Sequence, residues 1–316
     1  MVKYYVKEGG FMKELAEPEA GCWVNISPPF PPEELEEIAQ QFEIPLDFLT
    51  DPLDIDERPR FERDEEKRAI ILSTPILNPF EEDIDAIFIT VPLGIVITIE
   101  HVITITSQEN PVLNLFLDGK VKNFDPAEDQ LFVLQMMEQN VYRFLNSLKQ
   151  LNQRRNLIEK ELYHSSRNKE LQSLLSIEKS LVYFVSSLSD NELLKMKMKR
   201  TDFLHLGKDE EKTDLFEDII IDNSQAMQMA NMYTNILNGT MDAYGSIISN
   251  NLNLTIKRLT TITIILMVPT LVASYMGMNV MLPLADNSPV SFFVILIISL
   301  VVSLGIGWYF QRKNWF

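Results

Sequence analysis

Two uncharged apolar segments follow one another near the C-terminus, and they constrain the fold of this chain more than any other feature. Residues 259–276 and 290–310 contain no Asp, Glu, Lys or Arg. A helix needs about 20 apolar residues to cross the hydrocarbon core of a bilayer. A buried helix of a soluble domain explains one such segment more easily than two in tandem. The sequence therefore predicts a transmembrane hairpin, with a first span over residues 259–278 and a second over residues 290–311.

The charges that flank these segments predict the orientation of the hairpin. Lys257 and Arg258 precede the first span, and a basic tail at residues 312–316 follows the second. The predicted external loop, residues 279–289, has neither Lys nor Arg. Because positively charged residues stay on the cytoplasmic side of a membrane, both termini are expected in the cytoplasm. The protein is therefore predicted to lie in the cell membrane, in contact with lipid, with two spans.

The net charge of the 316-residue chain is −17, and the acidity is confined to its first part. Residues 1–128 contain 27 acidic and 10 basic residues, whereas the charges of the remainder cancel. An acidic surface repels polyanions, so nucleic acid is not expected as a partner. Solubility is the simplest explanation of this acidity, and the gathering of cations is the alternative.

Hydrophobic patterns predict an α+β cytoplasmic domain at residues 1–125. Strand-like apolar runs predict strands at residues 69–77, 86–92, 94–100 and 102–106. Amphipathic helices are expected at residues 31–42 and 111–118. A helical segment at residues 126–212 and a long stalk helix at residues 213–258 complete the part that precedes the first span.

The stalk helix carries almost no charge as it approaches the span. Only Asp242 is charged between Asn223 and Ile256, whereas a solvated surface helix would carry interleaved charges. Steps of three and four residues from Asp242 give a mostly small and polar stripe that ends at Ser274. Such a stripe in a span usually faces a bundle interior or water. The alternative is that its hydroxyls bond the preceding turn or permit close helix packing.

Since two spans cannot enclose a polar path, the stripe predicts several copies around an axis. Leu259 and Thr260 are alternatives for one position, because the register is open by one residue. The candidate path and gate residues are Asp242, Asn253, Ile256, Leu259, Thr263, Met267 and Thr270.

The end of the first span carries a family resemblance. Residues 269–279 read PTLVASYMGMN, which places Gly-Met-Asn at the outer end of the first of two C-terminal spans. In this arrangement the chain resembles the CorA family of magnesium transport proteins. Further matching segments are PLDFLTDPLDIDERPRFE at residues 45–62, FEDIIIDN at residues 216–223 and QRKNWF at the C-terminus. One departure is Met276, which stands where the family usually has an aromatic residue directly before the glycine.

The resemblance implies a homopentamer that conducts Mg²⁺ inward, with the first spans around the pore and the second spans outside. Mg²⁺ holds its waters tightly, so a selectivity filter should recognise the hydrated ion. Gly277, Met278 and Asn279 would supply a neutral ring of dipoles for this purpose. Gly277 would permit a tight turn, and its ordinary role is a helix C-cap. Apolar rings of the path, such as those of Ile256 and Met267, can close a channel by dewetting.

The resemblance also implies regulation by cytoplasmic Mg²⁺. Asp51 of one subunit and Asp218 of the next would share a regulatory divalent ion, with Asp222 as a further ligand. Two carboxylates repel one another unless a cation bridges them. Occupancy of this site would therefore hold the ring closed, and a fall in Mg²⁺ would open it. The alternative is that these residues are ordinary solvated acids.

Two other functions stay open. One is a transporter of Co²⁺, Ni²⁺ or Zn²⁺ with the same fold, and the other is a membrane-anchored sensor of divalent ions that does not conduct. Zinc-exporting relatives tend to differ at the middle residue of the tripeptide, so Met278 favours Mg²⁺. Soft metals favour His or Cys ligands, and neither residue occurs after Thr213. A sensor gains nothing from a polar stripe inside a span.

The sequence shows no pattern typical of an enzyme. His101, His164 and His205 are scattered, and Cys22 is the only cysteine, which excludes an intrachain disulfide. Neither a glycine-rich phosphate loop nor a nucleophile elbow is present. We therefore expect neither catalysis nor nucleotide binding, and a flux driven by concentration and membrane potential alone.

Overall fold

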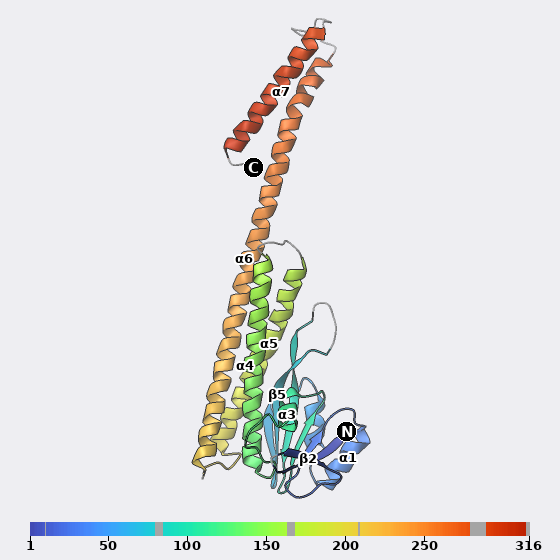
Figure 1. Ribbon diagram of the computed structural model, residues 1–316, viewed down its shortest axis with the longest axis vertical. Coiled ribbons are helices and arrows are strands. Elements are labelled where there is room, and N and C mark those ends of the chain that lie inside the picture. The colour runs from blue at the N-terminus through green and yellow to red at the C-terminus, as the bar shows by residue number, and fades with distance from the viewer. Residues whose placement is uncertain (10, 80–84, 163–167, 208, 279–288, 314–316) are drawn as a thin grey trace. The chain divides into compact units, whose positions relative to one another are not determined.

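The computed structural model describes residues 1–9, 11–79, 85–162, 168–207, 209–278 and 289–313. The chain divides into two compact units, Met1–Thr240 and Met241–Phe316. Helix α6 (Glu210–Met276) is continuous and contributes residues to both units (Figure 1).

A seven-stranded sheet organises the first unit (Figure 1), with the strand order β2-β1-β3-β7-β6-β5-β4. The strands are β1 (Val2–Glu8), β2 (Phe11–Leu15), β3 (Trp23–Ile26), β4 (Arg60–Asp64), β5 (Lys67–Leu77), β6 (Phe88–Ile97) and β7 (Val102–Thr106). Strands β3 and β7 pair in parallel, and all other neighbours pair in antiparallel fashion. The sheet is therefore mixed, and its one parallel pair joins residues far apart in the sequence.

Strands β5 and β7 agree with the predicted strands at residues 69–77 and 102–106. The prediction of two strands at residues 86–92 and 94–100 is wrong, because β6 runs through both without a break. Its pairing with β5 continues from Phe88 opposite Leu77 to Ile97 opposite Arg68. Pro92 and Gly94 suggest an interruption in the sequence, but long cross-strand pairing overrides this local preference.

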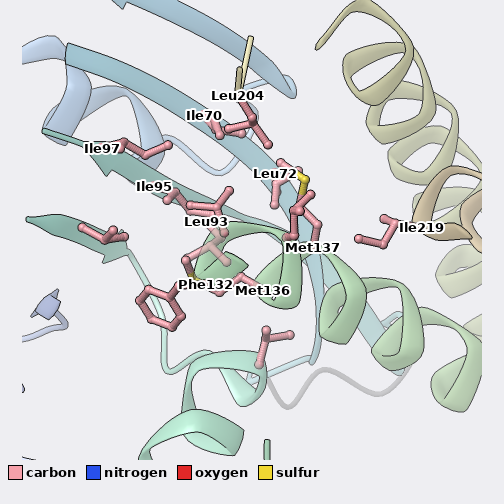
Figure 2. Packing of buried hydrophobic residues seen from close by; sticks show 14 of the residues in the cluster. Ile70, Leu72, Leu93, Ile95, Ile97, Phe132, Met136, Met137, Leu204 and Ile219 are labelled. Atoms are coloured by element: carbon pink, nitrogen blue, oxygen red, sulfur yellow. The ribbon is translucent and has the colours of Figure 1, made fainter. Parts of the chain in front are cut away.

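The two faces of the sheet support separate hydrophobic cores. On one face, α1 (Pro32–Gln41) and α2 (Asp47–Thr50) pack over buried residues such as Val24, Val96 and Ile103. On the other face lie α3 (Pro111–Leu117), α4 (Asp129–Leu162), α5 (Asn168–Thr201) and the first part of α6. Figure 2 shows Met137 of α4 between Leu72 of the sheet and Ile219 of α6. The second core thus joins the sheet to the long helix.

Buried asparagines complete the hydrogen bonding of β5 at Ser73. The pairing of β4 with β5 reaches only as far as Arg60 opposite Ile71, so β5 has no strand partner on that side at Ser73. The Asn191 side chain of α5 accepts from Ser73 N at 3.0 Å and donates to Ser73 O at 2.8 Å. Asn140 of α4 donates to the same carbonyl at 3.0 Å. Hydrogen bonds from two buried amide side chains thereby connect α4 and α5 to β5. Buried backbone N–H and C=O groups require such partners.

Helix α6 begins at Glu210, three residues before the predicted start of the stalk at Thr213. The Asp209 side chain accepts from Lys212 N at 3.1 Å, which is an N-cap bond and explains the earlier start. The helix passes through Pro269 and ends at Met276, and α7 (Pro289–Arg312) follows. Both helices contain a segment long and apolar enough to cross a membrane, as the two uncharged runs predict.

Candidate functional site

Helix α7 covers one face of α6 in the second unit. Thr261 of α6 is fully buried, and Ser299 and Ser303 of α7 are only 4% and 5% exposed. A Cβ atom added at Gly307 would meet Ile265 Cδ1 at 3.4 Å. Since Ser299, Ser303 and Gly307 are four residues apart, they form a single stripe of small residues along α7. Small residues of this kind let two helices approach closely within a membrane.

Replacing Gly307 by Leu is expected to destabilise the hairpin. An added Cβ reaches contact distance of Ile265, so Ala fits and a longer side chain must displace Ile265. Overpacking of this kind usually costs about 1–3 kcal/mol. We expect a lower thermal unfolding midpoint for the Gly307→Leu protein in lipid nanodiscs. Gly305→Leu is the matched control, because no described atom lies within 4 Å of a Cβ at Gly305. Equal midpoints for the two variants would contradict this packing.

The candidate path residues lie on the face of α6 that α7 leaves uncovered. Leu259 and Met267 are 65% and 55% exposed, and Thr263 and Thr270 are exposed as well. Successive residues of an α-helix turn by about 100°, which places these four on the side opposite Thr261. The remaining candidates, Asp242, Asn253 and Ile256, are also exposed. The structure therefore leaves the stripe free to face water or other copies of the chain.

The hydroxyls of the stripe bond the preceding turn of their own helix. Thr263 Oγ1 donates to Leu259 O at 2.9 Å, and Thr270 Oγ1 donates to Leu266 O at 3.0 Å. The alternative interpretation, in which these threonines bond their own helix, therefore accounts for the hydroxyl hydrogen atoms. It does not consume the lone pairs of the oxygens, which still accept hydrogen bonds. An exposed stripe of acceptors is chemically suited to donors such as the waters of a hydrated cation.

Gly277 and Met278 continue the helical turn at the end of α6. Gly277 N donates to Ala273 O at 3.0 Å and to Ser274 O at 3.2 Å, and Met278 N donates to Tyr275 O at 3.3 Å. Gly277 directly follows the last helical residue, Met276, as expected of a C-cap, but it does not have the left-handed backbone that would require glycine. A Cβ there would meet backbone oxygens no closer than 3.5 Å. Within one chain, nothing described requires glycine at 277, and Asn279 lies outside the described residues.

Asp51 belongs to a group of acids around one arginine. It begins the short helix η1 (Asp51–Leu53), and its Oδ2 lies 2.5 Å from Arg60 Nη2 of β4. Arg60 also pairs with Glu57, and its Nε lies 2.6 Å from Glu62 Oε1. Partial burial raises the pKa of Asp51, and the opposing effect of Arg60 is smaller. The predicted regulatory ligand is thus an ion-paired carboxylate, and Arg60 is a residue that the sequence analysis missed. The alternating charges of DERPRFE were the available signal.

Gly94 of β6 allows the turn that carries Asp51 to lie against the sheet. A Cβ at position 94 would come within 2.8 Å of both Pro52 Cβ and Ile105 Cγ2, and closer still to Pro52 Cγ. Pro52 is the residue after Asp51 and is buried. Glycine is required here because the backbone of η1 approaches β6 so closely. Gly94 therefore positions Asp51 without contacting it.

Asp218 and Asp222 lie with Glu138 on facing surfaces of α6 and α4. Burial raises the pKa of Glu138, and the nearby charge of Asp222 raises it further. Tyr142 Oη donates to Glu138 Oε1 at 3.5 Å, and its pKa is raised by burial and by these three acids. Asp51 is not part of this group. Within the described part of the chain, no three His, Cys, Asp or Glu side chains are arranged to hold a metal ion. One chain therefore does not assemble the predicted regulatory site.

Comparison with known proteins places these features in context. A family model described as "CorA-like Mg2+ transporter protein" matches residues 18–312. The chain is 29% identical over 298 residues to the cobalt/magnesium transport protein CorA of Methanocaldococcus jannaschii. That alignment covers 93% of this chain and 90% of the relative.

Solved structures show the same likeness. The complete structure of the CorA magnesium transporter from M. jannaschii superposes with a TM-score of 0.78 and 26% identity, covering 100% of this chain and 99% of that one. The ZntB cytoplasmic domain from Vibrio parahaemolyticus matches with a TM-score of 0.61 and 10% identity, over 78% of this chain and 98% of that domain. At such low identity the second likeness concerns the fold alone. The first extends over both units of the chain.

Proposed function

The chain belongs to the family of CorA-like Mg²⁺ transporter proteins, and on this premise we propose that it is a channel that carries Mg²⁺ into the cell. The resemblance read from the Gly-Met-Asn run and from residues 45–62 is confirmed at the level of the family. For this chain itself, the observation that carries the proposal is the exposed polar stripe of α6 on the face opposite α7. This arrangement suits a helix that lines a path, with α7 between it and the lipid.

The assembly that we propose is a homopentamer in the cell membrane, with both termini in the cytoplasm. Two helices of one chain cannot surround water, so the α6 stripes of several copies must face a common axis. The apolar side chains of α7, such as Leu304 and Val301 at 68% and 62% exposure, would then contact lipid. In this proposal Asp242 and Asn253 form polar rings at the cytoplasmic end of the path.

Selection of Mg²⁺ is proposed to occur at Gly277, Met278 and Asn279. The amide oxygen of Asn279 accepts hydrogen bonds from coordinated water, so it would recognise the ion together with its hydration shell. A neutral ring attracts cations without retaining them as strongly as a carboxylate ring would. Further along the path, Ile256, Leu259 and Met267 are proposed to form the apolar gate. Exposure of all three on the stripe face is consistent with this role.

Regulation by cytoplasmic Mg²⁺ is proposed to involve Asp51, Asp218 and Asp222 from neighbouring copies. Since one chain keeps Asp51 apart from the Asp218 group, a shared ion needs two subunits. Any divalent ion bound by Asp51 must also share that carboxylate with Arg60. The ion pair would lower the affinity of the site, which suits a sensor of millimolar rather than trace cation levels.

Transport is proposed to be driven by the electrochemical gradient. A membrane potential is worth roughly 2.3 kcal/mol per elementary charge per 100 mV, and twice that for a divalent ion. This energy is sufficient for inward flux of Mg²⁺ without nucleotide hydrolysis. Co²⁺ and Ni²⁺ are further candidate cargoes, because a filter for hydrated ions discriminates weakly among ions of similar size. The M. jannaschii relative is named for both cobalt and magnesium.

The test is ion flux into liposomes that contain the purified protein and an internal Mg²⁺-sensitive dye. We expect Mg²⁺ uptake that follows an imposed inside-negative potential. Co²⁺ and Ni²⁺ should compete with this uptake, and Zn²⁺ should compete weakly. Protein-free liposomes are the control. A properly assembled protein that binds Mg²⁺ yet gives no flux would favour the sensor. Zn²⁺ uptake without Mg²⁺ uptake would favour the zinc transporter.

A further inference from the structure

A fully buried lysine joins α5 to α6 in the first unit. Lys195 of α5 has no exposed surface, and its Nζ donates to Asn223 Oδ1 of α6 at 2.8 Å. Asn223 is also fully buried, and its Nδ2 donates to Leu188 O of α5 at 3.0 Å. One asparagine thus fastens α6 to two successive turns of α5. Lysine is almost never fully buried without an acidic partner, so this contact needs an explanation.

The surroundings of Lys195 favour the neutral amine. A protonated lysine has three N–H donors, and Asn223 Oδ1 is its only acceptor among the residues that the structure describes. Asn191, one turn earlier on α5, is already committed to Ser73. Burial lowers the pKa of Lys195 to about 7, and Glu192 opposes this shift. Other ionisable groups on the packed helices include Glu138 and Arg143 on α4, Lys199 on α5, and Asp218 and Asp222 on α6.

We propose that Lys195 is a proton-dependent clamp between α5 and α6. In its neutral form it remains buried and holds Asn223, and protonation weakens the contact because the ammonium group lacks acceptors and water. Acidification of the cytoplasm would therefore loosen the segment of α6 around Asn223. This segment contains Asp218 and Asp222, so the clamp links protons to the region where we propose regulation by Mg²⁺. The consequence for transport rests on the proposed function, whereas the clamp itself does not.

The dependence of this opening equilibrium on pH has a defined direction and size. An exposed lysine has a pKa of about 10.4, so an opening that exposes Lys195 takes up a proton between that pH and about 7. The opening equilibrium constant should rise about tenfold for each pH unit of acidification in this range. Below about pH 7 both the closed and the open forms are protonated, and the dependence should level off.

Hydrogen–deuterium exchange of the full chain in nanodiscs tests the clamp. The measured quantity is the protection of peptides that cover residues 216–230, at pH 7.0 and pH 8.5. The same peptides of a Lys195→Met protein at the same pH correct for intrinsic exchange. We expect wild-type protection, relative to this variant, to fall by about 15-fold from pH 8.5 to 7.0, because the closed form is itself about half protonated at pH 7.0. Lys197→Met, at an exposed position two residues away, should retain the wild-type behaviour.

A second variant keeps the test decisive if Lys195→Met folds poorly. Asn223→Asp supplies an anionic acceptor that keeps the lysine protonated, so it should remove the pH dependence while keeping the contact with Lys195, at the cost of the hydrogen bond to Leu188 O. If protection depends on pH to the same extent in the wild type, Lys195→Met and Asn223→Asp, the clamp is refuted. Exchange is measured without ion flux, so this outcome is independent of whether the protein conducts Mg²⁺.

Discussion

Replacing Asn279 by Ala is expected to reduce Mg²⁺ uptake by liposomes that contain the protein to the level of protein-free liposomes. In the sequence Asn279 follows directly on Gly277 and Met278, which are exposed at the end of α6. In the proposed pentamer, each substitution removes an amide oxygen from every subunit, so the ring loses all its side-chain acceptors at once. Without them a hydrated ion must shed water, which Mg²⁺ does reluctantly. The measurement is dye-reported flux at an imposed potential.

Two further variants sharpen this prediction. Asn287→Ala makes the same chemical change elsewhere in the predicted external loop, and we expect near-normal uptake. Asn279→Asp replaces neutral dipoles by charges, so it should bind divalent ions more tightly and release them slowly. The oligomeric mass of each variant, measured by light scattering, shows whether assembly is intact. Normal uptake by an assembled Asn279→Ala protein would remove Asn279 from the filter.

The second large effect is expected from the double variant Asp51→Asn, Asp218→Asn. If these carboxylates share a regulatory ion between subunits, their removal should make flux insensitive to Mg²⁺ inside the liposomes. Both residues occupy accessible positions, and Arg60 retains Glu57 and Glu62 when Asp51 loses its charge. The fold of the first unit should therefore survive. Flux is measured as a function of internal Mg²⁺, together with the protection that Mg²⁺ gives against proteolysis.

The matched control for this experiment removes two charges that belong to neither group. Asp64→Asn at the end of β4 and Glu211→Gln in the first turn of α6 are both exposed. The control protein should keep the wild-type inhibition by internal Mg²⁺. An inhibition curve that is unchanged in the double variant Asp51→Asn, Asp218→Asn would refute the regulatory site and leave the transport proposal in place.

Structure can be predicted from this sequence where one local property decides it. Absence of charge over residues 259–276 and 290–310 is sufficient to predict two membrane-competent helices, because hydrocarbon excludes charge whatever the rest of the fold does. Continuous apolar patterns likewise predicted β5 and β7. At residues 86–100 the local pattern is misleading, because Pro92 and Gly94 suggest a break that pairing with β5 overrides. Local preference is weaker than ten consecutive cross-strand pairs.

The features of the candidate site also divide into those that the sequence predicts and those that only the tertiary structure decides. Helical periodicity alone placed Thr263, Met267 and Thr270 on one stripe, because the period of an α-helix is constant. That this stripe is opposite α7 follows only from the packing of Ser303 and Gly307 against α6.

The remaining features depend on contacts between distant parts of the chain, and only the tertiary structure decided them. Arg60 lies nine residues after Asp51 and forms an ion pair with it. Gly94 leaves room for the turn that carries Asp51. Lys195 appears in the sequence as one base among several at the end of a helix, yet it is the fully buried one. The burial of a lysine and its hydrogen-bond partner determine its protonation, and neither can be read from the residues adjacent to it in the sequence.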